Sequence, residues 1–109
     1  MITRKEIIKL TKPIITEILN EINLKKECNT VKYIANYNVT GDNIDISITR
    51  YALNKTNNTA VFCTIYPGIT GIMYFTLWNM FIINELDKVS NIKSLFRNYM
   101  LLLGFTEND

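Results

Sequence analysis

The sequence predicts an α+β domain in which helices pack on a small antiparallel meander sheet of three or four strands. Three observations predict this class. Apolar residues recur at helical spacing near the N-terminus, alternate with polar residues from about position 30 to 49, and return to helical spacing near the C-terminus. The order of helix, strands and helices favours an N-terminal helix, a central sheet, and two C-terminal helices packed on it.

The N-terminal helix is expected to begin at Thr3 and to fade at 25–27. Thr3 and Glu6 have the spacing of a capping box, in which the Thr3 hydroxyl accepts the Glu6 N–H and the Glu6 side chain returns to the Thr3 N–H. Pro13 cannot bond the carbonyl of Lys9, so we expect a kink, or two abutting helices with Thr11 as the second cap. The apolar stripe of this helix comprises Ile7, Ile8, Thr11, Ile14, Ile15, Ile18, Leu19 and Ile22.

A hairpin and a third strand follow. Alternation from Thr30 to Val39 and from Ile44 to Thr49 predicts two strands joined by a turn at 40–43. After a polar turn at 54–58, the segment from Ala60 to Tyr66 is almost entirely apolar or Thr. That composition is expected of a strand that is central in the sheet or covered on both faces.

The segment from Ile72 to Val89 fits two structures. Its apolar density supports a fourth strand over Ile72–Trp78, but its polar residues gather on one side of a helical wheel and its Met, Leu, Trp and Phe residues are not β-branched. We therefore expect a buried helix from about Ile72 to Val89 with Trp78 in the core. A second helix over 91–103 should end at Gly104 as its C′ residue, and the tail 106–109 should be frayed.

Length and composition indicate one domain spanning residues 1–109. The chain has 48% hydrophobic residues and no Pro/Gly/Ser-rich linker. Its net charge of +2 is far below the basic excess of proteins that neutralise many phosphates. Seventeen Ile, fourteen Asn and nine Lys against three Arg and three Ala indicate an A+T-rich genome. A small chain of this composition without motifs suggests a virus, a phage or another mobile element.

The sequence predicts a cytoplasmic protein, in the cytoplasm of a host cell if it is viral. The N-terminus has no signal-peptide pattern. The uncharged stretch 69–83 is shorter than the roughly twenty residues that span a bilayer, so we expect no membrane association. Cys28 and Cys63 have no CxxC or Cys/His spacing and are expected to be reduced thiols that serve packing.

The residues argue against catalysis. The chain has no histidine, which removes Ser-His and Cys-His nucleophiles, His general bases and His-bearing metal sites. The four glycines form no phosphate-binding motif, although 67–71 could present N–H groups to an anion. Three carboxylate pairs are better explained as solvated surface: Asp42 with Asp45, Glu85 with Asp87, and Glu17 with Glu21. We expect no enzyme activity, no metal and no cofactor.

The hairpin carries the residues best suited to binding. Tyr and Arg are favoured interface anchors, and an edge strand can pair with another chain, so we interpret the protein as a non-catalytic protein-interaction module, an inhibitor or accessory factor. The same surface could serve homo-oligomer formation. The alternative is a module that binds a nucleotide or single-stranded nucleic acid through Tyr and basic residues. The candidate binding residues are Lys32, Tyr33, Tyr37, Arg50 and Tyr51.

Overall fold

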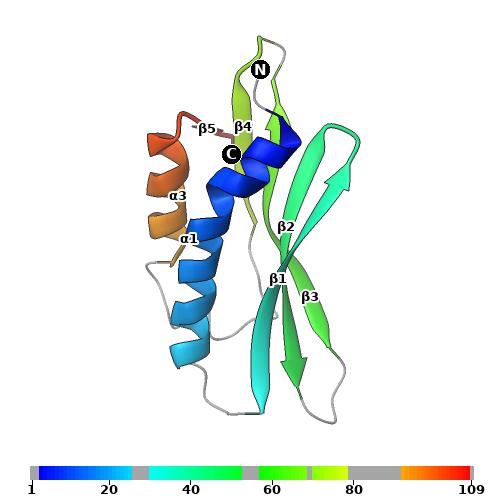
Figure 1. The fold of residues 1–109 in the computed structure, drawn as a ribbon, viewed down its shortest axis with the longest axis vertical. Helices are drawn as coiled ribbons and strands as arrows, with labels where there is room; N and C mark the ends of the chain where they lie inside the picture. The colour runs from blue at the N-terminus through cyan, green and yellow to red at the C-terminus, as the bar shows by residue number, and fades with distance from the viewer. Residues whose placement is uncertain (1–2, 26–29, 53–56, 69, 79–91, 109) are drawn as a thin grey trace.

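Two helices pack against one face of a five-stranded sheet (Figure 1). The computed structural model describes residues 3–25, 30–52, 57–68, 70–78 and 92–108. The strands lie in the order β1-β2-β3-β4-β5, and all neighbours are antiparallel except β4 and β5, which are parallel. This confirms the α+β class with an N-terminal helix and a C-terminal helix. The elements are α1 (Arg4–Lys25), β1 (Val31–Thr40), β2 (Asn43–Ala52), β3 (Asn58–Pro67), β4 (Met73–Leu77), α3 (Ile92–Leu102) and β5 (Thr106–Glu107).

The segment after residue 72 differs from the prediction. Met73–Leu77 is a strand, so a helix beginning near Ile72 is wrong, and the rest of that expected helix, 79–89, lies outside the described residues. Pairing with β3 explains the difference, because it supplies hydrogen-bond partners for the backbone of this segment. The cross-strand pairs run from Cys63 opposite Leu77 to Pro67 opposite Met73. Among the described residues one C-terminal helix is present, where two were expected.

The tail is also ordered differently from the prediction. Thr106 and Glu107 pair with β4 as the fifth strand, where fraying was expected. The Asn108 N–H donates to the Phe75 carbonyl at 2.9 Å, and the Thr76 hydroxyl donates to the Asn108 carbonyl at 3.0 Å. These tertiary hydrogen bonds have no counterpart in the local sequence pattern, which explains why the strand was not predicted.

Helix α1 begins as expected and continues through Pro13 as one helix. The Glu6 N–H donates to Thr3 Oγ1 at 3.2 Å, while the Glu6 carboxylate accepts the Thr3 hydroxyl at 3.0 Å, and this second bond replaces the one expected to the Thr3 N–H. Figure 1 shows the N-terminal turns of α1 at an angle to the remaining turns, which fits a proline within the helix. Thr11 is not a second cap, because its hydroxyl donates to the Ile7 carbonyl at 2.8 Å inside the helix.

The core lies between this helix layer and the sheet. The apolar stripe of α1 is buried as predicted, with Ile8 and Leu19 at its margin. The pairing of β2 with β3 shifts register after Ile46, which leaves Phe62 as the extra residue of a β-bulge. The Phe62 ring meets Phe96 of α3 edge to face at 5.0 Å between ring centroids, and Phe96 meets Phe75 of β4 at 6.3 Å. Aromatic contacts therefore fasten α3 to the centre of the sheet.

Helix α3 ends in a Schellman motif, in which Gly104 is the C′ residue that the sequence predicts. The Phe105 N–H donates to the Met100 carbonyl at 3.0 Å, and the Gly104 N–H donates to the Leu101 carbonyl at 3.1 Å. Gly104 has φ +96°, a backbone conformation that residues with a Cβ atom rarely adopt. The side chains of Met100 and Phe105 are both buried, and the chain continues from this motif into β5.

We predict that Gly104→Ala lowers the free energy of unfolding by about 1–2 kcal/mol. A methyl group at this position meets no atom within 4 Å, so the cost comes from the positive φ alone. Urea denaturation measures it, and Ser94→Ala, exposed on the same helix, is the matched control and should change stability by less than about 0.5 kcal/mol. An unchanged midpoint for Gly104→Ala would contradict this backbone assignment.

Candidate functional site

The two faces of the hairpin have different surroundings. In an antiparallel pair, residues directly opposite one another share a face, so the register from Val31–Ala52 to Thr40–Asn43 assigns every side chain of β1 and β2. One face packs against the helices and is called the helix face. The other is called the outer face, and it comprises Lys32, Ile34, Asn36, Asn38, Asp45, Ser47, Thr49, Tyr51, Thr59, Val61, Thr64, Tyr66, Tyr74 and Thr76.

The five predicted binding residues are divided between these faces. Tyr33, Tyr37 and Arg50 lie on the helix face, where Tyr33 is opposite Arg50 and only 1% exposed. Lys32 and Tyr51 lie opposite each other on the outer face, and both are exposed. The predicted group therefore does not form one surface. Alternation already separates Lys32 from Tyr33, but it does not reveal which face the helices cover.

Tyr37 is a structural link between β1 and α1. Because the Thr11 hydroxyl donates its proton to the Ile7 carbonyl, the Tyr37 hydroxyl must donate to Thr11 Oγ1, at 2.9 Å. Burial disfavours the charged phenolate and raises the pKa of the Tyr37 hydroxyl. The protonated hydroxyl is the form that the fold stabilises, so this side chain holds the helix against the sheet.

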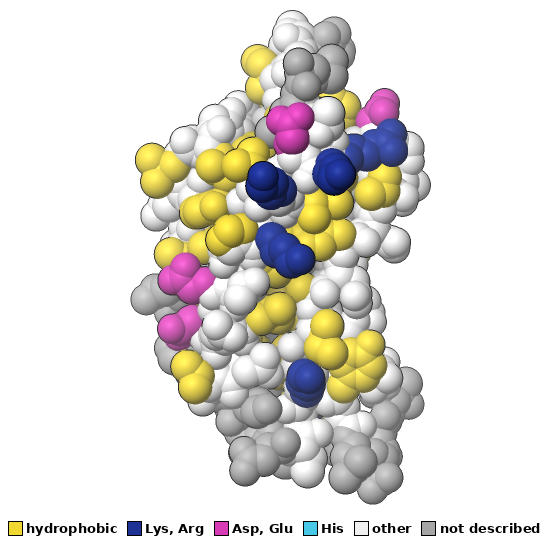
Figure 2. All heavy atoms as spheres, viewed as in Figure 1, with side chains coloured by type: hydrophobic (Ala, Val, Ile, Leu, Met, Phe, Trp, Pro, Cys, Tyr) yellow, Lys and Arg dark blue, Asp and Glu magenta, His cyan; other side chains and the backbone are white. Residues whose placement is uncertain are grey.

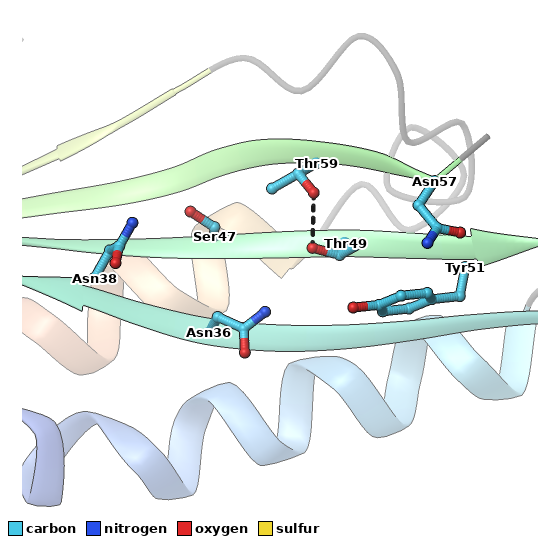
Figure 3. A pocket seen from close by; sticks show the side chains of 7 residues that line it. All are labelled: Asn36, Asn38, Ser47, Thr49, Tyr51, Asn57 and Thr59. Atoms are coloured by element: carbon cyan, nitrogen blue, oxygen red, sulfur yellow. Dashed lines mark hydrogen bonds between the residues drawn. The ribbon is translucent and has the colours of Figure 1, made fainter.

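A groove runs along the outer face over β1, β2 and β3 (Figure 3). Its volume is about 460 Å³, and none of the described side chains that line it is charged. Ser47 and Thr49 at its floor are only 9% and 5% exposed, and the Thr49 and Thr59 hydroxyls are hydrogen-bonded at 2.9 Å. The lining residues are Asn36, Asn38, Ser47, Thr49, Tyr51, Asn57 and Thr59. The groove offers amide and hydroxyl groups beside one aromatic ring.

A second aromatic side chain is fixed against the outer face. The Trp78 indole N–H donates to Thr64 Oγ1 at 2.8 Å, and the Thr64 hydroxyl donates to Asp45 Oδ1 at 2.7 Å. Trp78 is nevertheless 47% exposed, so the prediction that it belongs to the core is wrong. Its ring is held in one orientation before any ligand binds, which lowers the entropic cost of using it as a contact.

Two tyrosines extend this aromatic surface. Tyr66 and Tyr74 are cross-strand partners on the outer face, with stacked rings whose centroids are 5.8 Å apart. The Asn108 side-chain amide donates to the Tyr66 hydroxyl and ties the tail to this pair. The sequence interpretation missed Tyr66, Tyr74 and Trp78 as surface residues. Their signal was the alternation of 74, 76 and 78, which becomes visible once this segment is treated as a strand.

The charged side chains of the described surface do not line this groove. Of the residues that define the outer face, Lys32 is the one cation and Asp45 the one carboxylate. Figure 2 shows basic side chains over the N-terminal half of α1, where Arg4, Lys5, Lys9 and Lys12 are exposed. Arg4 also lies 3.5 Å from the Asp42 carboxylate at the hairpin tip. The outer face therefore carries few charges and is mainly an aromatic and hydrogen-bonding surface.

The described ranges contain neither a metal-binding cluster nor a membrane-spanning helix. Within residues 3–25, 30–52, 57–68, 70–78 and 92–108, no three Cys, Asp or Glu side chains gather as metal ligands. No helix in these same ranges has the length and apolar character needed to cross a membrane. No family model, curated protein or solved structure matches the chain. Its function must therefore be argued from the surface itself.

Proposed function

We propose that this chain is a non-catalytic protein-interaction module that binds a protein partner through the outer face of its sheet. The observation that carries the proposal is the combination of two exposed aromatic anchors, Tyr51 and Trp78, with an uncharged polar groove. Tyr and Trp dominate the energetics of protein interfaces, and interface centres are depleted in charge. The groove's amides and hydroxyls can donate to and accept from the backbone of an extended segment.

The proposed partner class is a protein of the cell in which the chain acts. The composition indicates an A+T-rich genome, and we extend this to an inhibitory or accessory protein of a virus or mobile element acting in the cytoplasm. Such a protein works by occupying a surface of its target, which requires no catalytic group. The Trp78 ring is held by a hydrogen bond, and so are the Thr49 and Thr59 side chains in the groove. Such a surface suits binding without large rearrangement.

The proposal can be tested without knowing the natural partner. Peptides selected from a randomised display library on the immobilised chain would be measured by calorimetry against the wild type and against Tyr51→Ala and Trp78→Ala. Each substitution should weaken binding by about 30-fold or more, as expected for the loss of an interface anchor. The readout is the dissociation constant, and circular dichroism confirms that each variant is folded.

Leu102→Ala is the matched control. Leu102 is 88% exposed, is apolar, and lies on α3 away from the outer face, so its removal should leave the dissociation constant within about twofold. If the selected peptides bind Tyr51→Ala and Trp78→Ala as tightly as the wild type, the outer face is not the binding surface. The same conclusion follows if the library yields no binder.

The second candidate is a module that binds single-stranded nucleic acid or a nucleotide. One observation favours it: Lys32 lies directly opposite Tyr51, so a cation and an aromatic ring share one place on the outer face. A base could stack on Tyr51 while Lys32 contacts a phosphate. With one cation involved, the dissociation constant for oligo-dT should change with salt with a slope near that of a single phosphate contact. A lack of oligo-dT retention at low salt would remove this candidate.

A further inference from the structure

The exposed edge of β1 supplies a second interaction surface, distinct from the outer face. β1 is the first strand of the sheet and, among the described strands, has a neighbour on one side only, β2. Its pairing with β2 runs through ten residues without a bulge. In such a ladder alternate residues direct both backbone groups towards the neighbouring strand, and the residues between them direct both groups away from it.

Asn23 identifies which residues of β1 face outward. The Tyr33 N–H donates to Asn23 Oδ1 at 3.1 Å, and Asn23 Nδ2 donates to the Tyr33 carbonyl at 3.3 Å. Tyr33 therefore directs both backbone groups away from β2, and so do the odd-numbered residues that follow it. The hairpin turn gives the same assignment. Thr40 and Asn43 close a two-residue connection and are hydrogen-bonded to each other, so the even-numbered residues of β1 face β2 and the odd-numbered residues face outward.

Beyond Tyr33, three residues of β1 have outward backbone groups: Ala35, Tyr37 and Val39. Within the described part of the chain, no hydrogen bond engages their outward N–H and C=O groups. From Ile34 to Thr40 the strand has no charged residue and no proline, the two features that commonly protect an edge. Figure 1 shows this half of β1 at the margin of the molecule, with no other described element beyond it.

We propose that β1 pairs with β1 of a second copy of this chain, antiparallel and centred on Tyr37. The available stretch is symmetric about this residue. Four positions before it, Asn23 already bonds the backbone of Tyr33, and four positions after it lies the turn residue Gly41. A two-fold axis at Tyr37 pairs each Ala35 with the Val39 of the copy. All outward groups of the three residues are then bonded, in about six hydrogen bonds.

Charge complementarity supports the same register. Pairing centred on Tyr37 brings Lys32 of one copy opposite Asp42 of the other, twice by symmetry. Lys32 is exposed, and the Asp42 side chain is 81% exposed. The pairing also covers Val39, which is 45% exposed in the single chain. Backbone, charge and apolar contacts therefore agree on one partner, a second copy. This proposal does not depend on the function proposed for the outer face.

Val39→Pro tests the pairing. Proline removes the outward N–H, which β2 does not use, so the variant should keep the hairpin while losing two of the bonds between copies. Sedimentation equilibrium should show dimers of the wild type at high concentration, and a dissociation constant at least about tenfold weaker for Val39→Pro. Val39→Thr keeps the N–H and is the matched variant, so it should weaken dimerisation far less than Val39→Pro does. Circular dichroism verifies folding of both variants.

The register has its own test. Lys32→Asp should weaken dimerisation, and combining it with Asp42→Lys in an Arg4→Ala background should restore it, because the two charges then exchange places and the Arg4 guanidinium no longer opposes the new charge. In concentrated solution, hydrogen exchange should slow at the amides of Ala35, Tyr37 and Val39 alone within β1. A chain that is monomeric at all concentrations, a dimer insensitive to Val39→Pro, or a failure of the double variant to restore pairing would each overturn the proposal.

Discussion

Replacing Phe96 with alanine should lower the free energy of unfolding by about 3–5 kcal/mol. Phe96 is fully buried, and its ring packs edge to face against Phe62 and Phe75. The substitution removes the apolar area of the ring and leaves a cavity between α3 and the sheet that neighbouring rings on two strands cannot easily fill. Urea denaturation followed by circular dichroism measures the loss.

Leu95→Ala is the control for this prediction. Leu95 precedes Phe96 on the same helix but is 38% exposed, so its truncation should cost less than about 1 kcal/mol. The comparison keeps helix propensity similar while changing burial. If Phe96→Ala cost no more than Leu95→Ala, α3 would not be held to the sheet by the aromatic contacts described above.

The elements with local signals were predicted correctly. The capping residues and apolar stripe of α1, the two strands of the hairpin and the glycine that ends α3 depend on side chains within a few positions of one another. Each signal is short-range and can be read from neighbouring residues alone. The structure bears out all of these elements, with shifts of one or a few residues at their ends.

The elements that depend on distant partners were not predicted. Met73–Leu77 is a strand because β3 offers it a ladder, and Thr106–Glu107 is a strand because β4 does. Both segments carry residues that also suit a helix or a loop, so propensity alone could not decide between them. Since the error at β4 assigned Trp78 to the core, it also concealed the aromatic part of the outer face.

The candidate site was predictable only in part. Lys32 and Tyr51 were proposed from their residue types, and both are exposed on the outer face. Tyr33 has the residue type of Tyr51 and follows Lys32 on β1, but it is buried. A step of one residue along a strand moves the side chain to the other face. Residue type therefore predicts the chemistry of an anchor, whereas its exposure depends on where the helices pack.

The stability of the wild type should fall steeply above about pH 9, and Cys63 should be a main cause. Cys63 is fully buried on β3. Burial raises the pKa of its thiol well above the usual range, the carboxylates of Asp45 and Glu107 raise it further, and a hydrogen bond with the Thr76 backbone lowers it. Above the ordinary thiol pKa, the unfolded chain releases this proton while the folded chain keeps it, so rising pH favours unfolding.

The expected slope is about 1.4 kcal/mol per pH unit for this one group, beginning near pH 8.5–9. Tyr37, whose pKa is also raised, adds to the loss from about pH 10 upward. Cys63→Ala should cost about 1 kcal/mol at pH 7, because it removes one buried atom from the core. Its slope above pH 9 should be shallower, so its stability should overtake that of the wild type by about pH 10.5.

Urea midpoints measured for both proteins from pH 7 to pH 11 test this crossing. Cys63→Val is a second variant, which fills the position without a thiol and should show the same shallow slope. Parallel pH profiles for the wild type and both variants would show that the Cys63 thiol ionises as readily in the folded chain as in the unfolded one. A crossing would show that the fold keeps this thiol protonated in alkali, because burial disfavours the thiolate and the negative charges of Asp45 and Glu107 disfavour it further.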